Sequence, residues 1–308
     1  MTIVVTMVKL LFTMAAGFYL NKKNILDQET SKKLSTMVVN FTAPLLIISS
    51  ASQMAGDSQG VIILMLISGL CLYFLFPLVS IPVVRLLRVP SDCRGVYQCM
   101  IMFANTAFMG YPVVQALYGE SSIFYTTIFN LGYNILFYTY AAFLLDKDGG
   151  QASRFEPRRL LSAGFLSGFL AVIIPFACIT LPDIILQPCS FIGSITTPMS
   201  MLIIGSNMAN YPLHDIFSEK KVYVMAALRL LVIPVLAALF MSFLTDDPLL
   251  ICMTSMTLGM PVGSMVAMAS SKYEKQGRIG SISVVMTTIC SMVTIPILAT
   301  IFKFWFGV

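Results

Sequence analysis

The chain has 308 residues, of which 57% are hydrophobic and only 11% are charged, and its formal net charge is +5. An ordinary soluble domain carries about 25% charged residues, so this composition excludes a water-soluble globular fold. A positive net charge suits nucleic acid in a soluble protein, but here the position of each charge matters more than the sum. No nucleic-acid partner is expected.

Apolar runs of about 18 to 25 residues recur along the chain, and about 20 residues of helix cross the hydrocarbon core of a bilayer. Each run therefore predicts one membrane-spanning helix. The predicted spans lie near 3–20, 34–52, 61–84, 95–117, 122–145, 160–181, 184–208, 221–243, 249–271 and 279–304. The fold class predicted is an all-α integral membrane protein with ten transmembrane helices, whose partner is the lipid bilayer.

The first span has no basic residue ahead of it and no convincing small-residue cleavage site, so we expect a retained helix rather than a signal peptide. The seven cysteines never form a Cys-x-x-Cys pair, so they resemble small core hydrophobes more than a disulfide or metal framework. They are Cys71, Cys93, Cys99, Cys178, Cys189, Cys252 and Cys290. No metal site and no cofactor are expected.

Basic residues gather in alternate loops. The loops after spans 1, 3, 5, 7 and 9 hold 16 of the 19 Lys and Arg residues, whereas the four intervening loops hold none. The positive-inside rule makes the basic side cytoplasmic, so both termini face outward. The predicted location is the cell membrane, crossed many times, with extracytoplasmic termini.

A loop at 146–159 divides the chain into a first five-helix repeat, 1–145, and a second, 160–308, joined by this cytoplasmic linker. Because each half has an odd number of spans, the second half begins on the opposite side of the membrane. The halves would then form an inverted repeat, a common device of secondary transporters.

Paired proline motifs support this 5+5 inverted repeat. Pro44 in span 2 and Pro198 in span 7 each follow a threonine by one or two residues, and Gly-x-Pro motifs stand in spans 4 and 9 as Gly110-Tyr111-Pro112 and Gly259-Met260-Pro261. From Pro44 to Pro112 is 68 residues, and from Pro198 to Pro261 is 63. The corresponding motifs therefore recur at similar spacing.

Each Gly-x-Pro motif predicts a helix break, because proline removes a backbone donor and glycine removes the side chain that resists unwinding. Within a bilayer, freed backbone groups are tolerated where they line protein or water, so two breaks predict a cavity near the midplane. Two crossing half-helix N-termini there suit a carboxylate. A simple proline kink satisfied by its neighbours is the better explanation of one break alone, but the matched pair favours a site.

Asparagines stand beside the first break at Asn105 and on one face of span 5 at Asn130 and Asn134. Asparagine donates to a carboxylate without placing a full charge in the membrane, although for Asn130 a role as interhelical glue is equally good. The predicted substrate-binding residues are Asn105, Thr106, Gly110, Tyr111, Pro112, Asn134, Gly259, Pro261, Gly263 and Ser264, with Asn40, Asn130 and Arg229 as further candidates.

The block from Asn105-Thr106 to Gly110-Tyr111-Pro112, followed by Tyr118-Gly119-Glu120, resembles the fourth-helix motif of the auxin efflux carrier family. This family includes plant PIN carriers and bacterial malate or malonate permeases. Further matches at Gly17-Phe18-Tyr19-Leu20 and from Pro261 to Pro296 extend the resemblance over essentially the whole chain.

The resemblance implies a homodimer in which spans 1, 2, 6 and 7 form a scaffold while spans 3–5 and 8–10 move as an elevator. It also implies a site at the crossing of the two broken helices, with Asn105 near the substrate carboxylate. One departure is the loop 146–159, which is long in plant carriers and short here. Plant-style regulation is therefore not implied, and auxin itself is a poor guess for the substrate.

No Asp or Glu lies deep within a predicted span, which argues against a proton relay, although Asn, Ser, Thr and carbonyl oxygens remain able to bind Na⁺. Uniport driven by the membrane potential, or anion exchange, needs no titratable group and is favoured. Lys9 and Arg229 are basic residues inside spans, and either could balance an anion or extend to the interface. We favour a structural or interfacial role for Lys9, and for Arg229 we leave that role and the balancing of an anion equally open.

An enzyme is the weaker hypothesis, because the single histidine, His214, lies in a cytoplasmic loop and no His-Glu-x-x-His motif is present. We predict a secondary transporter that moves a small organic anion, such as a mono- or dicarboxylate, by an elevator mechanism. The alternative is a Na⁺-coupled organic anion symporter of the bile-acid symporter type. Uptake measured with and without Na⁺ separates the two.

Overall fold

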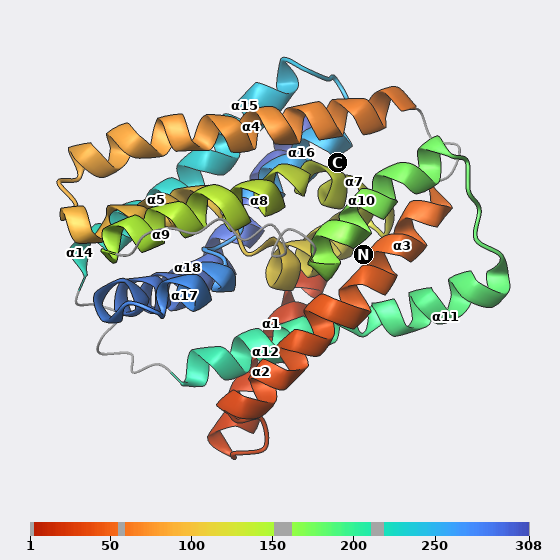
Figure 1. Ribbon diagram of the computed structural model, residues 1–308. Coiled ribbons are helices and arrows are strands. Elements are labelled where there is room, and N and C mark those ends of the chain that lie inside the picture. The colour runs from red at the N-terminus through yellow and green to blue at the C-terminus, as the bar shows by residue number, and fades with distance from the viewer. Residues whose placement is uncertain (1–2, 55–58, 151–161, 211–218, 308) are drawn as a thin grey trace.

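The computed structural model describes residues 3–54, 59–150, 162–210 and 219–307, and these form helices and the loops between them (Figure 1). Within these ranges no β-strand forms, apart from a single antiparallel bridge between Ala104 and Val262. Part of the predicted linker, residues 151–159, and the predicted loop position of His214 lie outside the described residues.

Each predicted span coincides with one helix or with a consecutive run of helical segments. In the first half these are α1 (Ile3–Lys22), α2 (Gln28–Met37), η1 (Val38–Thr42), α3 (Ala43–Gln53), α4 (Gln59–Leu86), η2 (Ser91–Cys93), α5 (Arg94–Met102), η3 (Thr106–Gly110), α6 (Tyr111–Tyr118), α7 (Ser121–Phe129), α8 (Leu131–Leu136), η4 (Phe137–Ala141) and α9 (Ala142–Asp148). In the second half they are α10 (Ala163–Phe176), α11 (Asp183–Ser194), α12 (Thr196–Ala209), α14 (Lys220–Ala227), η6 (Leu228–Val232), α15 (Ile233–Ser242), α16 (Pro248–Leu258), α17 (Ser264–Ser270) and α18 (Glu274–Phe306).

Among the described residues, five continuous helical runs are long and apolar enough to cross a membrane, or six if the bent pair α7 and α8–α9 is one span. The runs are Gln28–Gln53, Gln59–Leu86, Asp183–Ala209, Lys220–Ser242 and Glu274–Phe306. The apolar helix α10 has only 14 residues, and the predicted spans 4 and 9 are each interrupted. The count of ten spans therefore stays a prediction, although the all-helical membrane class is confirmed.

Large apolar side chains stand exposed on the outer faces of these helices. Leu78 on α4 is 67% exposed, Phe191 on α11 is 76% exposed, and Phe243 after α15 is 88% exposed. Soluble monomers rarely display apolar surface so widely, because water penalises it. Lipid removes that cost, so these faces suit the hydrocarbon of a bilayer.

Three π-helical turns lie just ahead of prolines. In each, the N–H of the residue before the proline donates a hydrogen bond to the carbonyl oxygen five residues earlier. These bonds run from Ala43 to Val38, from Tyr111 to Thr106 and from Ile233 to Leu228. A proline has no N–H and its ring crowds the carbonyl four residues earlier, and a widened turn relieves both problems. These prolines therefore widen a helix without interrupting it.

The prediction that Gly110-Tyr111-Pro112 breaks span 4 is wrong in its position. The π-turn η3 runs directly into α6 through these residues, and the chain leaves helical geometry earlier, at residues 103–105. Pro261, in contrast, lies inside the interruption between α16 and α17.

The helices form two groups. The first group is α1–α3 with α10–α12, and the second group is α4–α9 with α14–α18. Figure 1 shows α2, α3, α11 and α12 on one side and α5, α9, α17 and α18 on the other.

Within the first group, the backbones of α1 and α12 are in direct contact. A Cβ atom on Gly17 would lie 2.1 Å from Leu202 O, and one on Gly205 would lie 1.9 Å from Met14 O, so only glycine fits at these positions.

Candidate functional site

The two helix interruptions meet inside the second group. Asn105 donates its backbone N–H to Pro261 O at 2.8 Å, and Gly263 donates its N–H to Phe103 O at 2.9 Å. These two bonds flank the antiparallel bridge between Ala104 and Val262. We call residues 103–105 and 259–263 the crossing. The two segments pair backbone N–H and carbonyl groups with each other, as buried polar groups require.

Gly263 allows the two segments to approach. A Cβ atom there would lie 3.0 Å from Ala104 O and 3.3 Å from the hydroxyl of Tyr133, so a larger residue would press the segments apart. A third element, α18, supports the crossing, because Val262 donates its N–H to Thr287 Oγ1 at 3.0 Å. The backbone of the second interruption is therefore held from two sides.

The N-terminal ends of the two following half-helices come together at the crossing. Asn105 is the residue before η3, and Gly263 is the residue before α17, whose first residue is Ser264. Asn105 Nδ2 lies 3.4 Å from Ser264 Oγ, which is a long hydrogen bond that leaves the amide available to a better acceptor. The first N–H groups of a helix lack helical partners, so this side of the crossing offers donors to an anion.

The C-terminal ends of the two preceding half-helices meet at Arg229. This side chain is 1% exposed; its Nε donates to Met260 O at 3.1 Å and its Nη1 donates to Ile101 O. Its Nη2 is buried and has no acceptor within the part of the chain that the structure describes. The predicted extension of Arg229 to the membrane interface is therefore wrong, whereas a structural role is compatible with its burial. Lys9, in contrast, is exposed.

The two asparagines of span 5 differ in their surroundings. Asn130 is buried, its Oδ1 accepts from the Tyr73 hydroxyl at 2.6 Å, and its Nδ2 donates to Thr126 O at 2.8 Å. Both polar ends are thus used within the fold, which favours interhelical glue. Asn134 is half-buried and donates only a long bond, 3.4 Å, to Asn130 O, so its amide remains available.

Of the other predicted site residues, some lie next to the crossing and others lie further along the helices or in the first group. Thr106 bonds weakly to Ala104 O at 3.5 Å, while Gly110, Tyr111 and Pro112 continue the helix beyond, where the Tyr111 hydroxyl accepts from Thr127 at 3.3 Å. Gly259 packs against Pro234, because a Cβ atom there would lie 3.1 Å from that ring. Asn40 is exposed on η1 in the first group of helices, so the structure does not join it to the crossing.

The sequence analysis missed Thr287 and Tyr133 as neighbours of the crossing. Thr287 has the ordinary local bond of a helical threonine, to Ser283 O at 2.7 Å, so its second bond to Val262 had no sequence signature. Tyr133 had one available signal, its position directly before Asn134 on the polar stretch of span 5.

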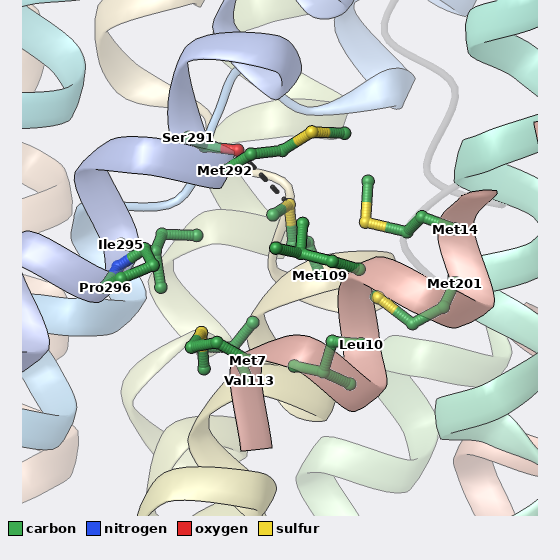
Figure 2. Close-up of a pocket in the computed structure, with 11 residues that line it drawn as sticks. Met7, Leu10, Met14, Met109, Val113, Met201, Ser291, Met292, Ile295 and Pro296 are labelled. Carbon is green, nitrogen blue, oxygen red and sulfur yellow. Dashed lines mark hydrogen bonds between the residues drawn. The ribbon is translucent and has the colours of Figure 1, made fainter. Parts of the chain in front are cut away.

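A small apolar cavity lies between the two groups of helices, which pack directly against each other around it (Figure 2). The cavity has a volume of about 20 Å³ and lies among α1, α12, η3–α6 and α18, and five methionines line it. These are Met7, Met14, Met109, Met201 and Met292. Ser291, the polar side chain of the lining, donates its one hydroxyl proton to Thr288 O at 2.6 Å, and Met109 Sδ lies 3.7 Å away as an alternative acceptor. Such a lining cannot replace the hydration of an anion, so this cavity does not suit a carboxylate.

Comparison with known proteins places the chain among membrane carriers. The model of the family described as "Membrane transport protein" matches residues 2–299. An uncharacterized transporter of Methanothermobacter thermautotrophicus is 24% identical over 296 residues, which is 95% of this chain and 96% of the relative. An uncharacterized transporter of Methanocaldococcus jannaschii is 23% identical over 297 residues, covering 93% and 94% of the two chains.

Proposed function

Because the chain belongs to the membrane transport protein family of auxin efflux carriers, and is thus a multi-pass membrane transporter, we propose that it carries a small organic anion across the cell membrane. The observation that carries this proposal is the crossing. Two half-helix N-termini meet there with Asn105 and Ser264, while Arg229 supplies a buried positive charge. No acidic side chain is buried among the described residues to repel an anion. A mono- or dicarboxylate suits this electrostatic environment.

We propose an elevator mechanism within a ten-span, 5+5 inverted repeat. The first group of helices would serve as the scaffold and the second group, which contains the crossing, would move as one body. The methionine-lined cavity supports this division, because α1 and α12 face η3–α6 and α18 across it. Methionine is unbranched and flexible, so a methionine-rich boundary can repack while one group slides along the other. A homodimer and the absence of catalysis also belong to this proposal.

Reconstituted protein should transport or exchange a small carboxylate, with malate and malonate tested first. The physical reason is that hydrogen-bond donors lie at the crossing and no buried carboxylate among the described residues would repel an anion there. Uptake of labelled malate and malonate into proteoliposomes is the measurement, and protein-free liposomes are the control. Transport of cations or neutral sugars with inert carboxylates would contradict the proposal. Strict dependence on Na⁺ would instead favour the bile-acid symporter alternative.

The loop charges predict that residues 53 and 246 face outward and that residue 150 faces the cytoplasm. Gln53, Asp246 and Gly150 are all exposed, so a cysteine at each is accessible to a thiol reagent. In a cysteine-free background, Gln53→Cys and Asp246→Cys should be labelled by a membrane-impermeant maleimide added to intact cells, and Gly150→Cys only after permeabilisation. The reverse pattern would invert the proposed orientation.

A further inference from the structure

Arg229 binds two carbonyl groups that the helices themselves cannot satisfy. Ile101 lies in the last turn of α5, and Met260 lies just beyond the end of α16. The N–H four residues after Ile101 belongs to Asn105 and bonds to Pro261 O instead. Both carbonyls thus remain free at helix C-terminal ends, where partial negative charge accumulates.

The guanidinium is a permanent cation in this position, since arginine does not lose its proton in proteins. Within the described ranges Arg229 is the one buried charged side chain, and no carboxylate is buried beside it. Its charge is therefore stabilised by carbonyl oxygens and helix ends, in the manner of a bound metal cation.

The backbone around Arg229 is specialised as well. The residue lies in the π-turn η6, which Pro234 follows by two positions, and π-turns reorient the side chains they carry. The planar guanidinium then uses two different nitrogens to reach carbonyls on two different helices. A lysine ammonium could not present donors in that fixed fork.

We propose that Arg229 is a positioning residue whose guanidinium permanently occupies the carbonyl pocket in which an ion-coupled carrier would bind its cation. In inverted-repeat carriers, half-helix C-terminal ends and unwound carbonyls bind the coupling ion, while half-helix N-termini face the substrate. Here Arg229 holds the C-terminal side, and Asn105 and Ser264 stand on the N-terminal side. The inference rests on the proposed function, because it treats the crossing as the transport site.

Neutral variants should create a requirement for a free cation. We would purify Arg229→Ala and Arg229→Gln, the second keeping one amide donor in case the first does not fold. Thermal unfolding and malonate uptake would be compared in choline, sodium and guanidinium chlorides at equal millimolar concentration, where guanidinium denatures little. Both variants should unfold at a lower temperature in choline and be restored by guanidinium, which fits the vacated space, with a smaller restoration by Na⁺. Uptake in choline should fall by about tenfold or more and recover in parallel.

The wild type and Lys9→Ala, an exposed basic residue on α1, are the matched controls and should respond equally to all three salts. Neutral variants whose stability is lowered but whose cation response equals that of the controls would overturn the proposal, since Arg229 would then only fill space. Na⁺-dependent uptake by the wild type would overturn it as well. The unfolding measurement needs no substrate, so guanidinium rescue without carboxylate transport would sustain this inference and reject the proposed function; the opposite result would reject the inference alone.

Discussion

Asn105→Ala is expected to weaken carboxylate binding by roughly ten- to hundredfold, because loss of a hydrogen bond to a charged group costs on the order of 1.5–3 kcal/mol. The folded state should tolerate the change. Asn105 is 3% exposed, but its amide makes only a 3.4 Å bond to Ser264 Oγ, so little is lost in the absence of substrate. The measurement is the substrate Kd of purified protein alongside its unfolding temperature.

Asn130→Ala provides the contrast for that experiment. Asn130 uses Oδ1 for the Tyr73 hydroxyl and Nδ2 for Thr126 O, so its removal leaves a buried hydroxyl unpaired. We expect a lower unfolding temperature with little change in Kd. Asn105→Asp, which keeps the shape but adds a negative charge, should bind the anion still more weakly than Asn105→Ala. Unchanged affinity in both Asn105 variants would show that the substrate binds elsewhere.

Gly205→Ala is expected to have the largest effect on stability of any single methyl group added to the described helices. Its Cβ atom would lie 1.9 Å from Met14 O and 2.8 Å from the adjoining carbonyl carbon, and both are backbone atoms of α1 that cannot rotate away. Overpacking of this kind costs about 1–3 kcal/mol or more, and here the two helices of the proposed scaffold must separate. The yield of monodisperse protein and its unfolding temperature are the measurements.

Gly164→Ala is the matched control for Gly205→Ala. Gly164 also lies in a helix of the first group, on α10, but a Cβ atom there meets nothing within 4 Å. Alanine has the higher helix propensity, and the gain at this second position of α10 is at most about 1 kcal/mol, so this variant should be as stable as the wild type or slightly more stable. Equal stability of the two variants would contradict the close backbone contact between α1 and α12.

The sequence by itself determined the membrane class and the location of the helices, because insertion into a bilayer depends on the hydrophobicity and length of each segment, and both are local properties. It also placed one interruption correctly, since Pro261 acts on its own backbone. For the same reason the family block around Asn105 could be recognised without any tertiary contact. The matching motifs predicted one interruption in each half, but in span 4 the position they indicated was wrong.

Only the tertiary structure decided what the interruptions do. A π-turn accommodates the missing N–H and the ring of Pro112, so the helix continues through it. The chain instead leaves helical geometry at 103–105, where backbone groups bond to residues 261 and 263 of the other half. Arg229 looked equally suited to the interface until the free carbonyls of Ile101 and Met260 were brought to it. Asn130 acquired its structural role from Tyr73, 57 residues earlier. Each outcome depends on a donor and an acceptor far apart in the chain, and no local pattern records which acceptors remain unsatisfied once the helices have packed.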